Sequence, residues 1–382
     1  MKIKIAYICE ALGGGVSRHL LDLMYNIDKE KYEISLIYNL DRADNLFIAS
    51  IKDLKKLGVK FHPVKKFNRE ITVYDIKALY EITKEIKAIK PDIIHCHSSK
   101  AGALGRLAGK LAGVNKIIYT PHAYMTQDED LSMLKKKLFN GIEKILLNFT
   151  KYTINVSNGE KDFAIKTGIG NQKKNVVIYN GARLITSLDK KKIMNELSLK
   201  PNDYVIGYVA RLEEQKDPIE FVNIAREVVH EFPHCKFIFL GDGSLKAKIE
   251  SFIKENRLEK NVILLGYKQN VSDYLGVFNL YLTTAKYEGM PYSLIEALQY
   301  KLPIIGTDVT GNNEVIKHMS NGFLYERGEN TRAIDYIKKI IMNKEMYSCM
   351  SNESYKLFLE NFTLEKMIRE TENLYKKVEG EA

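Results

Sequence analysis

The alternation of short apolar runs with helix-patterned segments is the feature that most restricts the fold of this chain. Ile3–Cys9, Tyr32–Tyr38 and Pro91–His97 are rich in β-branched and aromatic residues, and a segment with the apolar period of a helix follows each of them. A second series of this kind begins at Tyr204–Val209 and continues to Phe323–Tyr325. Strands that alternate with helices predict a doubly wound α/β fold, with a parallel sheet covered on both faces.

The length and a pause in the pattern predict two domains. A chain of 382 residues is too long for one ordinary core. The alternation stops near Asn180-Gly181, a turn signal, and a polar, lysine-rich stretch follows to Asn202. We therefore expect an N-terminal domain at 1–182, a linker at 183–202, a second domain at 203–360 and a final helical segment at 361–382. Two such domains predict a cleft whose walls carry the strand-to-helix loops, where ligands bind in this class of sheet.

The excess of positively over negatively charged residues lies entirely in the first half. Residues 1–182 hold 30 Lys and Arg against 19 Asp and Glu, whereas the other 200 residues hold 28 against 29. This asymmetry indicates a nucleic acid, an anionic membrane surface or an acidic substrate as partner, unless these are ordinary solvated lysines.

The four cysteines have no paired spacing, which argues against a disulfide framework or a zinc site and for a reducing cytoplasm. The sequence also predicts no signal peptide, because Glu10 interrupts the first apolar run, and no transmembrane helix.

Two glutamates eight residues apart form the most informative motif, Glu288-Gly-Met-Pro-Tyr-Ser-Leu-Ile-Glu296. Glu288 lies in a Gly/Pro turn and Glu296 in an apolar segment that reads as a helix with Pro291 at its first position. The N–H groups at such a helix start favour an anion. Carboxylates that accept bonds from hydroxyls beside an anion site suit a sugar nucleotide.

Two loops carry further groups for phosphate. The glycines Gly13, Gly14 and Gly15 follow the first strand and let a phosphate or sugar approach the backbone, unless they form only a tight turn. A dinucleotide fingerprint would need its third glycine at Arg18, so the sequence does not predict NAD binding. Arg211 and Lys216 share one loop after a strand and could clamp a diphosphate, although such a pair is often plain surface charge.

Histidines and one basic segment complete the set of candidates. His122 follows a strand end and could donate a hydrogen bond to a sugar hydroxyl or oxyanion, or serve only the loop structure. His95 and His97 lie on one face of a strand, and with no third ligand at suitable spacing we interpret them as packing or acceptor-side residues. The helix expected at Leu131–Phe149 carries lysines beside apolar residues. It could lie on an anionic bilayer or bury its apolar side in the core.

Together these motifs resemble the retaining glycosyltransferases of family 4, which have the GT-B fold. The resemblance covers nearly the whole chain. It is carried by the paired-glutamate motif, by Gly207-Tyr-Val-Ala-Arg211 with Lys216, by the glycine loop and by Val177-Ile-Tyr-Asn180-Gly181. The stretches around Arg18-His19 and His97-Ser-Ser-Lys100 are similar to members that act in capsule and exopolysaccharide synthesis.

The resemblance implies a role for each motif in holding a nucleotide-sugar donor, UDP-linked by expectation. It assigns Arg211 and Lys216 to the diphosphate, Glu296 to the ribose and Glu288 to the transferred sugar. The donor is further lined by the glycine loop, by backbone N–H groups and by a position near the base, at Gly13, Gly14, Gly15, Tyr292, Ser293, Leu294 and Tyr267.

On the other side of the reaction, the resemblance implies His122 and Glu288 as catalytic residues. Arg18, His19, His97 and Lys100 are expected on the acceptor side. The final helix is expected to cross back to the first domain, and the enzyme to need neither a metal nor another cofactor.

The acceptor implied is a polyprenyl-diphosphate-linked sugar or an oligosaccharide, with an anionic membrane surface as a further candidate partner and no nucleic acid. We expect the protein in the cytoplasm, with peripheral attachment to the inner face of the plasma membrane as a variant. A sugar-nucleotide epimerase, a phosphorylase, a basic nucleic-acid-binding protein and a catalytically inactive sugar-nucleotide subunit are the alternatives. The phosphorylase lacks a supporting segment for a pyridoxal-phosphate lysine, and the binding protein lacks a nucleic-acid-reading motif.

Overall fold

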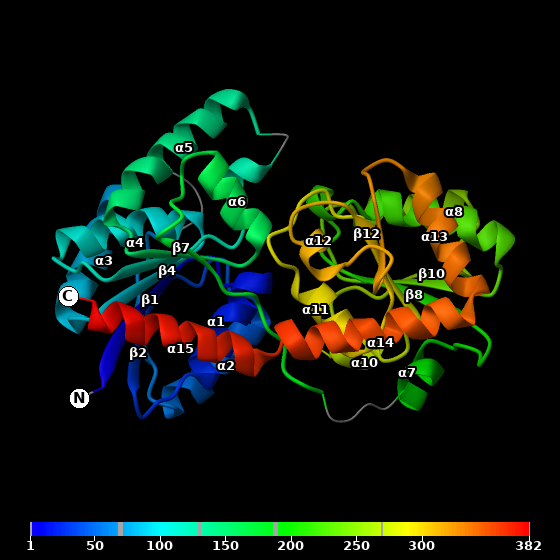
Figure 1. Ribbon diagram of the computed structural model, residues 1–382, viewed down its shortest axis with the longest axis horizontal. Helices are drawn as coiled ribbons and strands as arrows, with labels where there is room; N and C mark the ends of the chain where they lie inside the picture. The colour runs from blue at the N-terminus through cyan, green and yellow to red at the C-terminus, as the bar shows by residue number, and fades with distance from the viewer. Residues whose placement is uncertain (1, 68–71, 129–130, 186–189, 269, 382) are drawn as a thin grey trace. The chain divides into compact units, whose positions relative to one another are not determined.

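The computed structural model describes residues 2–67, 72–128, 131–185, 190–268 and 270–381. These residues form two compact units (Figure 1). Unit 1 comprises Met1–Asn180 and Leu364–Ala382, and unit 2 comprises Gly181–Thr363. Four residues of the linker expected at 183–202, residues 186–189, lie outside the described part of the chain.

Unit 1 is built on a seven-stranded sheet with the order β3-β2-β1-β4-β5-β6-β7, in which every pairing is parallel. The order reverses at β1, so the chain winds outward first in one direction and then in the other. The strands are β1 (Ile3–Cys9), β2 (Tyr32–Tyr38), β3 (Lys60–Pro63), β4 (Ile93–His97), β5 (Ile117–Thr120), β6 (Tyr152–Asn155) and β7 (Asn175–Val177).

Helices cover both faces of this sheet, each over its own apolar cluster. One cluster joins the sheet to α1, α2 and α15, and the other joins it to α3, α4 and α6. The helices are α1 (Gly14–Asn26), α2 (Asn45–Lys56), α3 (Tyr74–Ile89), α4 (Ser99–Leu111), α5 (Met133–Leu146), α6 (Asn158–Lys166) and α15 (Leu364–Gly380), with short 3₁₀ turns η1 (Met125–Gln127) and η2 (Leu147–Phe149).

Glycines allow α4 to lie directly on the sheet. A Cβ added at Gly105 would stand 2.6 Å from the Sγ atom of Cys96, and one at Gly109 would stand 2.7 Å from the Cδ1 atom of Ile117. Any larger residue would therefore lift the helix from the strands, and the start of α4 stays close to the carboxyl ends of β4 and β5.

The C-terminal helix α15 completes unit 1 (Figure 1). Tyr375 is fully buried, and its hydroxyl lies 2.6 Å from Nδ1 of His95 and 3.3 Å from the hydroxyl of Tyr7. The other ring nitrogen of His95 lies 2.8 Å from Oγ1 of Thr120. His95 is therefore a packing residue whose two nitrogens are both hydrogen-bonded inside the core.

Unit 2 repeats the plan with a six-stranded parallel sheet of order β10-β9-β8-β11-β12-β13. Its strands are β8 (Tyr204–Val209), β9 (Cys235–Leu240), β10 (Val262–Leu264), β11 (Leu280–Thr283), β12 (Ile304–Thr307) and β13 (Gly322–Tyr325). Its helices are α7 (Lys190–Glu196), η3 (Glu214–Lys216), α8 (Pro218–Glu231), α9 (Lys246–Glu255), α10 (Val271–Leu275), α11 (Tyr292–Gln299), α12 (Asn312–Val315), α13 (Asn330–Met342) and α14 (Lys344–Asn361).

The two doubly wound parallel sheets confirm the fold class, with four local corrections. The structure adds α6, β7 and α7, which we did not predict. Residues 158–166 and 190–196 are rich in polar side chains, so their helical period is weak, and β7 has only three residues. The helix expected at Leu131–Phe149 is α5 followed by a 3₁₀ turn.

Tyr375→Phe tests the attachment of α15. Removing the hydroxyl leaves Nδ1 of His95 buried without that partner, so we expect the free energy of unfolding to fall by about 1–3 kcal/mol. Denaturant unfolding followed by circular dichroism measures the change. Tyr80→Phe is the matched control, because the side chain of Tyr80 is 70% exposed. An equal loss in both variants would contradict the role of this hydrogen bond.

Candidate functional site

The carboxyl ends of β8 and β11 bring the predicted donor-binding residues of unit 2 together. These two strands are neighbours in the sheet, so the loops that follow them share one edge. Arg211 and Lys216 lie in the loop after β8, and Glu288 lies in the loop after β11. Residues that are far apart in the sequence thus face the same end of the sheet.

Lys216 and Glu288 form an ion pair through Nζ and Oε1. The two side chains are only 16% and 8% exposed. The backbone that carries Lys216 is held in place, because its carbonyl accepts hydrogen bonds from the hydroxyls of Tyr208 (2.9 Å) and Thr284 (3.0 Å). The cation expected at the diphosphate therefore lies against the carboxylate expected at the sugar.

Gln215 joins the same two loops and was missed in the sequence. Its Oε1 accepts from Arg211 at 3.2 Å, its Nε2 donates to the Tyr287 carbonyl at 3.1 Å, and its own carbonyl accepts from the Lys286 amide at 2.8 Å. A glutamine in a charged loop gives no sequence signal for such a bridge. Its effect is to hold Arg211 beside the loop of Glu288.

The start of α11 differs from the prediction by one residue. Pro291 is the N-cap, with extended backbone angles, and is not the first helical residue. The Leu294 amide, which we expected to face a ligand, donates to the Pro291 carbonyl at 3.2 Å. The Ser293 side chain hydrogen-bonds to Tyr281. The helix start is thus partly satisfied by its own turn and by a neighbouring strand.

The carboxylates of Glu288 and Glu296 both raise the pKa of the Tyr281 hydroxyl. Burial raises the pKa of Tyr281 first, and the negative charges of Glu296 and Glu288 raise it further. The hydroxyl donates to the Val209 carbonyl at 3.2 Å and accepts from the Val209 amide at 3.1 Å. Both carboxylates therefore lie near the Tyr281 hydroxyl at the end of β8.

Tyr267, predicted near a nucleotide base, is 57% exposed in unit 2. The residue before it, Gly266, accepts a hydrogen bond of 2.9 Å from the Gly241 amide. Gly241 in turn contacts the loop after β8, where an added Cβ would stand 1.7 Å from the Ala210 carbonyl oxygen. This packing links the loop of Tyr267 to the loop that carries Arg211 and Lys216.

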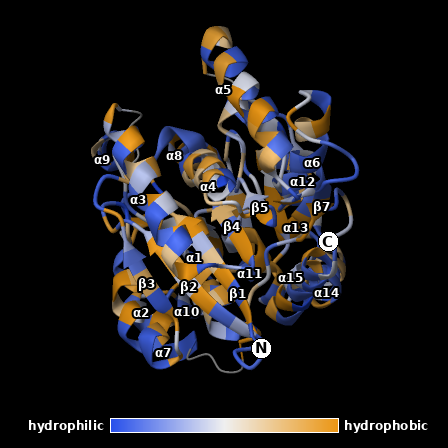
Figure 2. Ribbon diagram, turned by 90° about the vertical axis from the view of Figure 1, so that its left-hand side faces the viewer, coloured by the Kyte–Doolittle hydropathy of each residue, from blue (hydrophilic) through white to orange (hydrophobic). Residues whose placement is uncertain are grey.

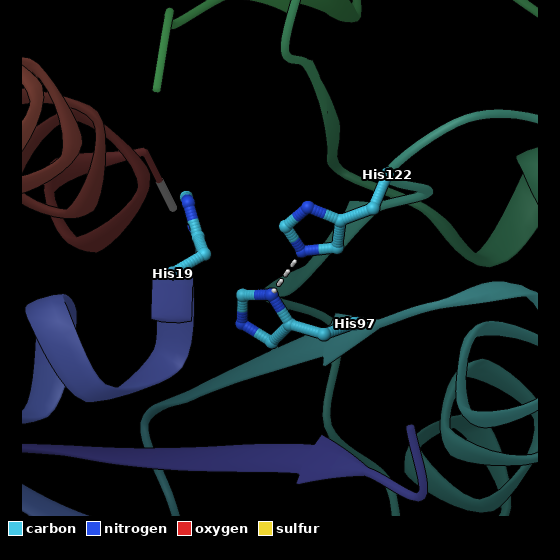
Figure 3. A group of neighbouring side chains, drawn as sticks. All are labelled: His19, His97 and His122. Atoms are coloured by element: carbon cyan, nitrogen blue, oxygen red, sulfur yellow. Dashed lines mark hydrogen bonds between the residues drawn. The ribbon is translucent and has the colours of Figure 1, made fainter. Parts of the chain in front are cut away.

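In unit 1, three histidines from separate elements meet (Figure 3). His19 comes from α1, His97 from the end of β4 and His122 from the loop after β5. Nδ1 of His97 lies 3.1 Å from Nε2 of His122, and Nδ1 of His19 lies 3.0 Å from Oδ1 of Asn180. We predicted no third ligand at suitable spacing for the pair His95 and His97. For His97 this prediction is wrong, because β1, β4 and β5 are adjacent and bring His19 and His122 to it.

Burial keeps these imidazoles neutral at physiological pH. Desolvation lowers the pKa of His19 to about 4 and the pKa values of His97 and His122 well below their usual range. Neutral imidazole has one N–H donor and one lone pair, so each ring can both donate and accept.

The backbone at His122 is held in an unusual shape by a residue that the sequence did not reveal. His122 and Ala123 have φ values of 57° and 85°, in the left-handed region. Glu160, buried on α6, accepts from the Ala123 amide at 2.6 Å and from the Val156 amide at 2.7 Å. Burial raises the pKa of Glu160 to about 7 in spite of these two bonds.

The glycine loop is already in contact with a carboxylate. The Gly14 amide donates to Asp44 at 3.1 Å, and the same carboxylate accepts from the Ser17 hydroxyl (3.2 Å) and caps α2 at the Phe47 amide (2.8 Å). The contact places a negative side chain where we expected phosphate or sugar. Gly13 and Gly15 flank this position at the start of α1.

The remaining acceptor-side candidates are ion-paired. Arg18 lies 3.0 Å from Asp22 on the same helix and is 36% exposed. Lys100 lies 2.6 Å from Asp75 and is 10% exposed, so it links α4 to α3. Arg18 is thus the more accessible of the two cations.

Glu160→Gln tests the support of the His122 loop. The folded pKa of about 7 lies above the ordinary 4.5. The stability due to the neutral carboxyl is therefore fully present below pH 4.5 and is lost as the pH rises through about 7. We expect the stability of the wild type relative to Glu160→Gln to fall between about pH 5 and pH 8. Thermal unfolding across this range measures it, with the exposed Glu30→Gln as control, and a constant difference would contradict the assignment.

Two family models match the chain in succession. Residues 13–184 match the model described as Glycosyltransferase Family 4, and residues 189–357 match Glycosyl transferases group 1. The UDP-Gal:alpha-D-GlcNAc-diphosphoundecaprenol alpha-1,3-galactosyltransferase of Escherichia coli is 28% identical, over 98% of this chain and 97% of its own length. The capsular polysaccharide biosynthesis glycosyltransferase CapM of Staphylococcus aureus is 23% identical, over 94% and 96%.

Solved structures share the fold at lower identity. A crystal structure of Anabaena HepE in complex with UDP and glucose superposes with a TM-score of 0.82 at 17% identity, and covers 98% of this chain and 99% of its own. The lipopolysaccharide outer core galactosyltransferase WaaB in its apo form gives 0.73 at 19% identity, over 98% and 100%. With two Rossmann-like parallel-sheet units and both family models in sequence, the chain belongs to the family 4 and group 1 glycosyltransferases of the GT-B fold.

Proposed function

We propose that this glycosyltransferase moves a sugar from a UDP-linked donor to a polyprenyl-diphosphate-linked or glycan acceptor, with retention at the anomeric carbon, in cell-surface polysaccharide synthesis. The observation that carries the proposal is the buried Lys216–Glu288 pair at the carboxyl edge of unit 2. The names of the Escherichia coli and Staphylococcus aureus relatives support the acceptor class and the process.

Donor binding in unit 2 exchanges one ion pair for another. Lys216 is paired with Glu288 inside a largely buried edge, where opposite charges attract strongly. A diphosphate offers Lys216 and Arg211 a better-matched anion, and the release of Glu288 lets its carboxylate accept hydrogen bonds from sugar hydroxyls. Glu296 is assigned to the ribose. The Lys216–Glu288 ion pair thus represents the donor site before the nucleotide sugar binds.

The chemical step depends on stabilisation of the leaving diphosphate and does not require an enzyme nucleophile that forms a covalent intermediate. Arg211, Lys216 and the start of α11 offset the charge that develops on the departing diphosphate. We propose front-face attack, in which the departing phosphate oxygen takes the proton of the acceptor hydroxyl, so that no metal is required. His97 engages Nε2 of His122, and Nδ1 of His122 is assigned to the reacting sugar.

Transfer from UDP-sugars to a synthetic polyprenyl-diphosphate-linked sugar tests the reaction class, with the configuration of the new linkage read by NMR. If the enzyme converts the donor into a different nucleotide sugar and transfers no sugar, the result would favour an epimerase instead.

Glu288→Gln separates an orienting role from a nucleophilic one. We expect turnover to fall by about 10²–10³-fold, because an amide oxygen accepts hydrogen bonds from sugar hydroxyls less strongly than a carboxylate does. Intact-mass measurement during turnover should find no glycosyl adduct on the wild type. Glu326→Gln, at an exposed position of unit 2, is the control. A covalent sugar on Glu288 would overturn front-face transfer.

The surface of α5 supports a membrane-bound acceptor. The structure contradicts burial of its apolar side: Leu134, Leu138 and Ile145 are 80%, 60% and 63% exposed, and Leu146 is its buried residue. Figure 2 shows apolar and hydrophilic residues interleaved along this helix. An exposed apolar stripe beside the lysines at 135–137 suits an anionic bilayer surface.

The attachment of α5 to unit 1 is polar. Arg106 of α4 is 2% exposed and lies 2.7 Å from Glu143 of α5, and its guanidinium stands 3.9 Å from the ring centre of Tyr119. The Tyr119 hydroxyl donates to the same carboxylate at 3.3 Å. Because these contacts hold the helix, its apolar side chains are left for another surface. None of the helices in the described part of the chain has the length and apolarity needed to cross a bilayer.

Replacement of Lys135, Lys136 and Lys137 by Gln tests surface binding. We expect binding to vesicles containing anionic lipid to fall at low salt, since each lysine near such a surface contributes about 1 kcal/mol. Vesicle flotation measures the bound fraction. The same change at Lys190, Lys191 and Lys192 of α7 is a control of equal charge and should have little effect. Equal losses, or no binding by the wild type, would contradict the membrane role.

A further inference from the structure

We propose that His19, His97 and His122 form a binding site for one divalent late transition-metal ion, Zn²⁺ in the first instance, that blocks sugar transfer when occupied. One ligand nitrogen from each ring lies within 4.8 Å of the other two (Figure 3). The metal site depends only on unit 1, whereas the blocking effect rests on the proposed role of His122.

The separations suit a single ion. Two nitrogens that each lie about 2.0–2.1 Å from Zn²⁺ in tetrahedral geometry are about 3.4 Å apart. Nδ1 of His97 and Nε2 of His122 are 3.1 Å apart, close to that value. His19 approaches from α1, with its ring centre 4.7 Å from that of His122 and 5.5 Å from that of His97. The three ligand nitrogens lie within 4.8 Å of one another, so coordination of one ion requires His19 to approach the other two rings.

The hydrogen bonds around the three rings are those of an incomplete network. Nδ1 of His19 faces Oδ1 of Asn180, so its proton is used there and its Nε2 retains a lone pair. An outer carboxamide on a ligand histidine fixes ring and tautomer in this way at metal sites. Nε2 of His97 is buried and has no hydrogen-bond partner among the described residues. Each neutral ring has one lone pair, so the three rings can offer three nitrogen ligands to one cation while their N–H groups point elsewhere.

The ligand set determines the class of ion. Nitrogen-only coordination by neutral imidazoles suits Zn²⁺, Cu²⁺ or Ni²⁺, whereas Mg²⁺ and Ca²⁺ require oxygen ligands. Three protein ligands leave a fourth position for water. An ion held there takes the lone pair of Nε2 of His122, replaces the contact with His97 and puts a dication beside the ring that is assigned to the reacting sugar, which is the proposed basis of the blocking effect.

Titration of the full chain, freed of any polyhistidine tag, with Zn²⁺ and with Co²⁺ tests the site. We expect one equivalent to bind, with a Co²⁺ absorption spectrum of nitrogen and oxygen ligands in four- or five-coordinate geometry. His19→Gln and His97→Gln should weaken binding by more than the roughly 10- to 100-fold that loss of an outer partner costs, and Asn180→Ala should weaken it within that range. His62→Gln, which removes a histidine of unit 1 that lies 2.9 Å from Glu85 and outside the site, is the control and should bind as the wild type does.

The results separate the site from the activity. No stoichiometric binding by the wild type, Co²⁺–thiolate absorption, or undiminished binding in folded His19→Gln and His97→Gln would overturn the site. If the variants do not fold, the Co²⁺ spectrum of the wild type tests the site, because it distinguishes nitrogen and oxygen ligands from thiolate ligands. Metal binding without transferase activity in the chelator-treated protein would refute the proposed function and leave the site standing. Transfer unaffected by bound Zn²⁺ would refute the blocking effect.

Discussion

Parallel pairing of the central strands is the constraint on which the rest of this structure depends. Because β1, β4 and β5 run in one direction, the residues that follow them share one edge of unit 1. The same rule brings the loops after β8 and β11 together in unit 2. Neither group of functional side chains is local in sequence, and each exists only because neighbouring strands end at the same level.

These edges hold polar groups in surroundings with little water. Lys216 with Glu288, the three histidines, and Glu160 with two backbone amides are each buried or nearly so. A buried polar group without a partner is costly, and apart from Nε2 of His97 these groups make contacts within their own unit before any substrate arrives. Substrate binding then becomes an exchange of partners, in which the ligand must replace contacts that the protein already makes. Such exchange favours ligands that carry both charge and hydroxyls, as a sugar nucleotide does.

Apolar periodicity was sufficient to predict the two sheets, because β1, β2 and β8 are rich in apolar residues and have the bounds expected from the sequence. Side-chain partners were harder to predict. The Gly14 amide meets Asp44 and the Ala123 amide meets Glu160, and both contacts depend on how distant loops fold back. The composition of α5 was compatible with burial or exposure of its apolar side. In the structure, α5 is attached to unit 1 through the polar Arg106–Glu143 contact, which apolar periodicity does not reveal. The roles assigned to individual site residues stay predictions.

The return of α15 to unit 1 affects how the protein is made. Leu364, Met367, Leu374 and Tyr375 belong to the same apolar cluster as the first strand. On the ribosome, unit 2 can close as soon as its own strands have emerged, whereas unit 1 lacks part of its core until α15, which follows unit 2 in the chain, has also emerged. The half of the protein that is synthesised first is thus the half that finishes folding last. During synthesis its sheet exposes an apolar surface that only the end of the chain can cover.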